Sequence, residues 1–116
     1  MKVIRGEITR ADLKEISSHY FKTLIKAVID VEREIIALDA ELHVDLEALL
    51  LEDGSKQENL WGINIYPDKT GEDFMEYSAL INIKPSQNNV SMDILCAYSL
   101  EEWKKKQVDG VNDNIH

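Results

Sequence analysis

Cysteine is almost absent from this sequence, since Cys96 is the only one among 116 residues. A single cysteine cannot form a disulfide within the chain, which indicates a reducing compartment such as the cytoplasm. Long apolar runs are also missing, because no stretch approaches the roughly 20 residues that a membrane-spanning helix requires. The amino end lacks the apolar core of a signal peptide. These absences predict a soluble, cytoplasmic protein.

Basic residues are scarce relative to acidic ones. Thirteen lysines and arginines against 22 aspartates and glutamates give the chain a net charge of −9. The acidic excess is concentrated in residues 27–60, and Lys104–Lys106 is the one compact basic cluster in the sequence. A chain this acidic repels a phosphate backbone, so the composition disfavours nucleic-acid binding.

The common catalytic motifs are missing as well. The sequence has no glycine-rich phosphate loop, no cysteine pair with zinc spacing and no serine in a nucleophile-elbow context. A length of 116 residues predicts one domain over the whole chain. Such a domain buries about two-thirds of its surface and needs neither a metal nor a disulfide to fold.

The first predicted elements are an edge strand at Val3–Ile4 and a helix over residues 9–23. Thr9 is a good N-cap with Asp12 three residues later, and Ile8 can pack on a leucine of the first turn. Apolar residues then recur at helical spacing: Leu13, Ile16, Tyr20, Phe21 and Leu24. This stripe predicts a helix that packs on one face of a sheet.

Residues 27–51 largely alternate between apolar and polar side chains, which predicts a β-hairpin with a two-residue turn at Asp39–Ala40. One face of this hairpin would be apolar: Ile29, Val31, Ile35, Ala37, Leu42, Val44, Leu46, Ala48 and Leu50. The other face would be acidic: Asp30, Glu32, Glu34, Glu41, His43, Asp45 and Glu47.

A rival interpretation of the same region is one continuous helix. The apolar residues from Phe21 to Leu42 also fall on a single helical stripe. Two observations favour strands instead: residues 41–47 alternate without a slip, and β-branched residues are dense at 28–36.

Two further strands are predicted at 61–66 and 77–83, with Asn64 and Asn82 on the acidic face. A capping box predicts a short helix near 99–108. The expected fold class is therefore α+β. It consists of an antiparallel β-meander of about four strands, with the N-terminal helix packed on one face and a short C-terminal helix.

Several segments together resemble a known family. They read KAVIDVEREIIAL, ELHVDLE, ALLLEDGSKQENLWGINIYPDK and LINIKPSQNN, and the resemblance spans roughly residues 8–92. The chain resembles a small family of uncharacterised prokaryotic proteins of about this length, a domain of unknown function. The resemblance implies no catalytic residues. After Met92 the chain departs from the family pattern, with DILCAYSLEEWKKKQ in place of a charged helix.

The acidic face is the candidate site. If the hairpin forms, Glu32 faces Glu47 and Glu34 faces Asp45, and like charges at such cross-strand positions destabilise each other. Counter-ions and water, raised carboxyl pKa values or a bound cation could offset this repulsion. Carboxylates with one imidazole are plausible ligands for manganese, iron, zinc, calcium or magnesium. The candidate metal ligands are Asp30, Glu32, His43, Asp45 and Glu47.

Two classes of function remain open. The first is a small binding or regulatory module that offers its acidic face or a sheet edge to a basic protein partner, or that forms a homo-oligomer. The second is a divalent-metal-dependent, hydrolase-like enzyme with the five candidate ligands around one ion. Outward strand faces are commonly rich in glutamate, so a solvated surface without a ligand is the third alternative.

Overall fold

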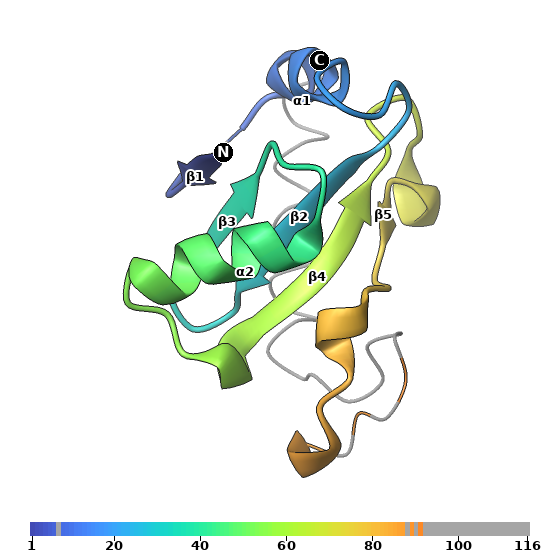
Figure 1. The fold of residues 1–116 in the computed structure, drawn as a ribbon. Coiled ribbons are helices and arrows are strands. Elements are labelled where there is room, and N and C mark those ends of the chain that lie inside the picture. The colour runs from blue at the N-terminus through green and yellow to red at the C-terminus, as the bar shows by residue number, and fades with distance from the viewer. Residues whose placement is uncertain (7, 88, 90, 92–116) are drawn as a thin grey trace.

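The computed structural model describes residues 1–6, 8–87, 89 and 91. Five antiparallel strands form one sheet in the order β1-β3-β2-β4-β5 (Figure 1). The strands are β1 Lys2–Ile4, β2 Ile25–Asp30, β3 Ile35–Leu38, β4 Leu60–Ile65 and β5 Met75–Glu76. The helices are α1 Arg10–Ser17 and α2 His43–Glu52, with 3-10 turns η1 Gln57–Asn59, η2 Gly71–Asp73, η3 Leu80–Asn82 and η4 Pro85–Gln87. The fold is α+β, as the sequence predicted.

The helix predicted near 99–108 lies outside the described residues. Within the described ranges, no helix is long and apolar enough to cross a membrane.

Helix α1 begins where the capping box placed it. The Thr9 hydroxyl accepts a hydrogen bond from the Asp12 backbone N–H at 3.1 Å, and the Asp12 carboxylate accepts one from the Thr9 N–H at 3.3 Å. Leu13 and Ile16 are buried against the sheet. The helix ends at Ser17, earlier than predicted, and the Ser17 hydroxyl bonds back to a carbonyl in the last turn.

Strands β2 and β3 form a hairpin, but its turn lies at residues 31–34 and not at Asp39–Ala40. The Asp30 carboxylate closes this turn. It accepts hydrogen bonds from two successive backbone N–H groups, those of Glu32 and Arg33, each at 2.9 Å. Aspartate stabilises turns in this way, so the chain reverses directly after the apolar run of β2.

The prediction of a second hairpin strand over residues 41–51 is wrong, because residues 43–52 form α2. Leu46 and Leu50, four residues apart, are both fully buried, as helical spacing requires. Val44, which a strand would place beside Leu46, is 52% exposed. The continuous-helix alternative is also wrong, since β2 and β3 precede α2. Leucine, alanine and glutamate dominate this segment, and their helix propensity outweighs the short alternation.

Helices α1 and α2 cover opposite faces of the sheet, and Figure 1 shows α2 lying across the near face. The α1 face carries Ile25, Ala27, Ile29, Ile36, Leu38, Trp61, Ile63 and Ile65. The α2 face carries Val28, Ile35, Ala37 and Leu60. Strands buried on both faces are apolar throughout, which is why β3 reads as the continuous run IIAL.

The strand predicted at 77–83 is wrong: β5 ends at Glu76, before this segment, and residues 80–82 form η3. A side chain of η3 bonds to β4. The Gly62 N–H donates to Asn82 Oδ1 at 2.7 Å, and Asn82 Nδ2 donates to the Gly62 carbonyl at 3.0 Å. The side-chain amide thus bonds to β4 as a neighbouring strand would. A Cβ at Gly62 would lie only 2.5 Å from the Ala79 Cβ, so glycine permits this close approach.

Candidate binding surface

The predicted acidic strand face is not formed. Asp30 is fully buried at the end of β2, where one carboxylate oxygen bonds to the 31–34 turn. The Glu32 carboxylate lies in that turn and accepts a hydrogen bond from Asn59 Nδ2 at 2.6 Å. The predicted cross-strand pairs of Glu32 with Glu47 and of Glu34 with Asp45 do not occur as strand pairs, because Asp45 and Glu47 belong to α2.

The three candidate ligands on α2 have different surroundings. His43 lies half-buried over β4, Asp45 is exposed, and the charge of Glu47 acts on Lys84, which is buried. Across the part of the chain that the structure describes, no group of three or more His, Cys, Asp or Glu side chains could hold a metal ion. The five predicted metal ligands therefore do not share a strand face, which was the basis of the metal-site hypothesis.

The His43 imidazole lies half-buried against the sheet. Its Nε2 lies 2.8 Å from the Ile63 carbonyl oxygen, a geometry in which the Nε2–H donates. Burial lowers the pKa of His43 below its ordinary value, and the positive charge of Lys26 acts in the same direction. The His43 imidazole thus connects the first residue of α2 to β4.

We expect acidification to destabilise the protein through His43. Because the pKa of His43 is lower in the folded chain than in the unfolded chain, the unfolded chain binds the proton first as the pH falls below about 6.5. This contribution to stability is complete above that pH and is lost as the pH falls through the folded pKa.

The variant His43→Gln, whose amide can still donate to the Ile63 carbonyl, removes the titrating group. Denaturant unfolding from about pH 7 to about pH 5 should therefore show a shallower loss of stability in His43→Gln than in the parent protein. Equal slopes in the two proteins would contradict this role of His43.

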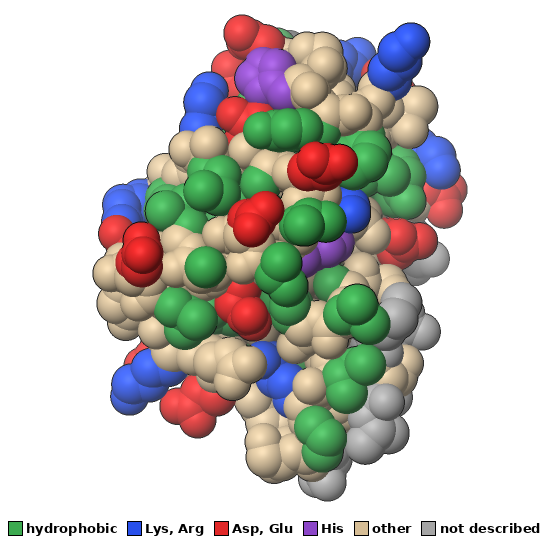
Figure 2. Space-filling model, in the orientation of Figure 1, with side chains coloured by type: hydrophobic (Ala, Val, Ile, Leu, Met, Phe, Trp, Pro, Cys, Tyr) green, Lys and Arg blue, Asp and Glu red, His purple; other side chains and the backbone are tan. Residues whose placement is uncertain are grey.

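The side of α2 that points away from the sheet is unusually apolar. We call this the outer face of α2 and define it by the exposed side chains Leu42, Val44, Asp45, Ala48, Leu51 and Glu52. Val44 is 52% exposed and Leu51 is 42% exposed, although the opposite side of the helix is already core. Figure 2 shows hydrophobic and acidic side chains interspersed on the side of the molecule that α2 occupies. A helix packed on a sheet normally presents polar residues to water.

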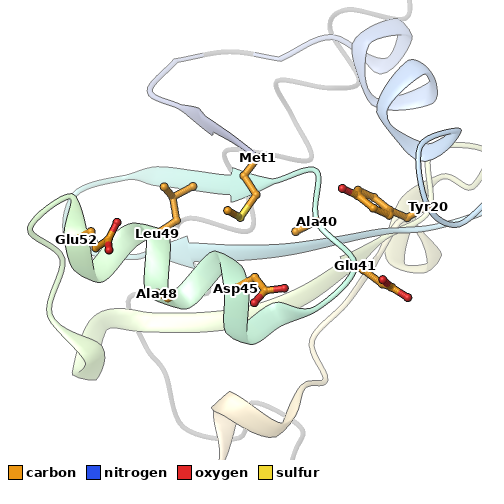
Figure 3. Close-up of a pocket in the computed structure, with 8 residues that line it drawn as sticks. All are labelled: Met1, Tyr20, Ala40, Glu41, Asp45, Ala48, Leu49 and Glu52. Carbon is orange, nitrogen blue, oxygen red and sulfur yellow. The ribbon is translucent and has the colours of Figure 1, made fainter.

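A groove of about 360 Å³ runs along one side of α2 (Figure 3). We call it the α2 groove, and its eight lining residues are Met1, Tyr20, Ala40, Glu41, Asp45, Ala48, Leu49 and Glu52. In Figure 3 the α2 residues form one wall, Met1 lies across from them, and Tyr20 lies at the end near Ala40 and Glu41. Three of the eight residues are carboxylates and none is Lys, Arg or His. The groove thus combines apolar walls with negative charge.

A side-chain contact between a histidine and an aspartate joins the segment that carries Tyr20 to the segment that precedes Glu41. His19 Nδ1 lies 2.6 Å from Asp39 Oδ1. His19 directly precedes Tyr20, and Asp39 directly precedes Ala40, in the connection from β3 to α2. Asp39 takes a φ of 73°, in the left-handed region that aspartate tolerates better than most residues. The contact between His19 and Asp39 thus joins two segments at the Tyr20 end of the groove.

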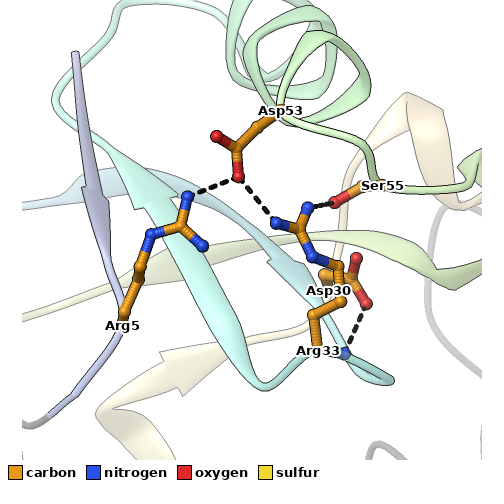
Figure 4. Close-up of polar contacts among 5 residues, drawn as sticks. All are labelled: Arg5, Asp30, Arg33, Asp53 and Ser55. Carbon is orange, nitrogen blue, oxygen red and sulfur yellow. Dashed lines mark hydrogen bonds and ion pairs between the residues drawn. The ribbon is translucent and has the colours of Figure 1, made fainter.

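The other end of α2 is held by the polar contacts in Figure 4. Arg33 donates to Asp53 Oδ2 and to Ser55 Oγ, both at 2.7 Å, and Arg5 pairs with the same Asp53 oxygen. Hydrogen bonds from Arg5 and Arg33 hold the pKa of Asp53 below its ordinary value. The end of α2 is therefore linked to the residue that follows β1 and to the 31–34 turn by surface contacts.

Fold and surface together define a small α+β domain in which a sheet presents one helix with an apolar and acidic outer face. The chain belongs to DUF5674, a family of proteins of unknown function, whose match covers residues 2–106. No curated protein and no solved structure matches the chain. The resemblance to an uncharacterised family is thus confirmed, and it assigns no activity.

Sequence reasoning placed several residues of this surface in the core. Leu42, Val44 and Ala48 were assigned to the apolar face of a hairpin, and Tyr20 to the buried stripe of a longer α1. The available signal was the segment LHVDLEALLLE, which has apolar residues in every direction when it is drawn as a helix. Only one side of such a helix can pack on a sheet, so the rest must lie exposed or meet another surface.

Proposed function

We propose that this protein is a small binding module that docks a basic protein segment on the outer face of α2 and in the α2 groove. The observation that carries the proposal is the exposure of Val44 and Leu51 on a helix whose other side is core. Contiguous apolar surface bordered by polar residues is typical of protein interaction sites. The single cysteine supports a reducing compartment, such as the cytoplasm, for this activity.

The charge of the surface supports a basic partner. Glu41, Asp45 and Glu52 line the groove, and the chain as a whole carries a net charge of −9. Complementary charge guides partners to a surface and excludes wrong ones. A second copy of the chain would bring the same carboxylates together around a two-fold axis, which disfavours homo-oligomers formed through this face.

Selection from a displayed library of random peptides tests this function. We expect the selected peptides to be enriched in leucine together with lysine or arginine. Their affinity, measured by fluorescence anisotropy, should fall about tenfold or more for Val44→Asp, because the variant puts a charge where the partner buries an apolar side chain.

The matched control is Ile83→Asp. Ile83 is a similarly exposed apolar residue, at 43%, outside both the outer face and the groove. This variant should bind the selected peptides as the parent protein does. Peptides that are neutral or acidic, or that bind Val44→Asp and the parent equally well, would overturn the proposed function.

A further inference from the structure

The α2 residues of the groove form a regular pattern. Asp45, Ala48, Leu49 and Glu52 are spaced at 0, +3, +4 and +7, so they occupy one stripe of the helix. The two carboxylates at its ends are two helical turns apart, about 10.5 Å along the axis at about 1.5 Å per residue. Between them lie one small and one larger apolar side chain. Figure 3 shows this order along α2, with Asp45 at the end nearer to Glu41 and Tyr20.

We infer that the partner segment is itself a helix, with basic residues at positions i and i+7 and apolar residues between them, lying along the α2 groove. This inference rests on the proposed function and adds the shape and spacing of the ligand. Basic residues seven positions apart lie on the same side of a helix and repeat the spacing of Asp45 and Glu52. Each basic residue can then meet one carboxylate while the apolar residues enter the groove.

An extended segment does not fit this spacing. A strand rises about 3.3 Å per residue, so it covers the distance between the two carboxylates in about three residues. Side chains three positions apart in a strand point to opposite sides, and only one of two such cations would face the groove. Side chains two or four positions apart share a side, but at about 7 Å or 13 Å they miss one carboxylate.

The two ends of the groove are unequal, which gives the partner helix a direction. Glu41 and the exposed Tyr20 ring lie at the Asp45 end of the groove. Glu52 lies at the opposite end (Figure 3). An arginine stacks on an aromatic ring while it pairs with a carboxylate, and lysine does so less well. We therefore place an arginine of the partner at the Asp45 end and a lysine or arginine at Glu52.

Two helical peptides of the same composition test the spacing. One carries arginine at i and lysine at i+7 with leucine and alanine between them, and its isomer carries the lysine at i+5, on a different side of the helix. We expect the i+7 peptide to bind the full-length protein about fivefold more tightly in fluorescence anisotropy, with the difference shrinking at high salt.

A charge exchange locates the contact. Glu52→Lys should weaken binding of the i+7 peptide by about fivefold or more, and replacing the peptide lysine by glutamate should restore the lost affinity. Glu58→Lys, an exposed acidic position on η1 outside the groove, serves as the control and should leave binding unchanged.

The outcomes separate the two levels of the proposal. If both isomers bind equally and both depend on Val44, the spacing inference is overturned and the proposed function stands. If neither isomer binds, or if binding of the i+7 peptide ignores Glu52, the spacing inference is overturned. The proposed function is then decided by whether the peptides selected from the library depend on Val44. Tight binding of the i+7 peptide with rescue by the exchanged charges supports both.

Discussion

Leu46→Ala is expected to lower the free energy of unfolding by about 3 kcal/mol, whereas Val44→Ala should change it by less than about 0.5 kcal/mol. Leu46 is fully buried and belongs to the cluster that joins α2 to the sheet, with Val28, Ile35 and Leu60. Removing its side chain leaves a cavity in addition to the lost burial of apolar surface. Val44 is half-exposed on the outer face of α2, and alanine has the higher helix propensity.

The contrast between the two variants decides between a helix and a strand for this segment. A strand would place both side chains on the core face, and both substitutions would then cost about 2–4 kcal/mol. Denaturant unfolding of the two variants at one pH measures the difference directly. Equal losses for Leu46→Ala and Val44→Ala would contradict the helix and with it the outer face.

Asn82→Leu is expected to lower the free energy of unfolding by about 3 kcal/mol, because the leucine side chain has the same number and branching of heavy atoms but no hydrogen-bonding groups. Asn82 is fully buried and holds both the N–H and the carbonyl of Gly62. The variant leaves these two backbone groups without their partner in a site that excludes water, and each such group costs about 1–3 kcal/mol.

Asn59→Leu is the matched control for Asn82→Leu. The Asn59 side chain donates to the Glu32 carboxylate at the surface, where water can replace the lost bond. Its effect should stay below about 1 kcal/mol. If the two asparagine variants unfold at the same denaturant concentration, the hydrogen bonds of the Asn82 amide do not stabilise the packing of η3 on β4.

The parts of the fold that depend on local chemistry could be predicted from the sequence. The capping box of Thr9 and Asp12 is formed by neighbouring residues, and it starts α1 at the expected position. Strand β4 is short, apolar and followed by Pro67, and it lies within one residue of its prediction. The edge strand at Val3–Ile4 is also confirmed, as part of β1.

The error over residues 41–52 has a physical cause. Over the seven residues of ELHVDLE, a period of two and a helical period both place several apolar residues on one side. Tertiary packing decides between the strand and the helix for this segment. Asp30 closes the β2–β3 turn early, β1 and β2 then flank β3, and the following segment must cover a sheet face. No single-sequence pattern contains that information.

The sequence predicted the acidic character of the candidate surface but not its location or shape. The acidic character of residues 27–60 is real, and Glu41 and Asp45 do line the α2 groove. The groove itself also needs Met1 and Tyr20, which come from segments far from α2 in the sequence. Such a combination follows from the packing of the strands and could not be found from spacing along the chain.

The central claim is that α2 packs on the sheet through Leu46 and Leu50 and binds a partner through its outer face. The most direct test is to map amide chemical shifts of the protein while a selected basic peptide is added. The predicted shifts are concentrated at residues 41–52 and at Tyr20, with little change in the 31–34 turn and in β5. Shifts concentrated in those two regions, with α2 unchanged, would contradict the claim.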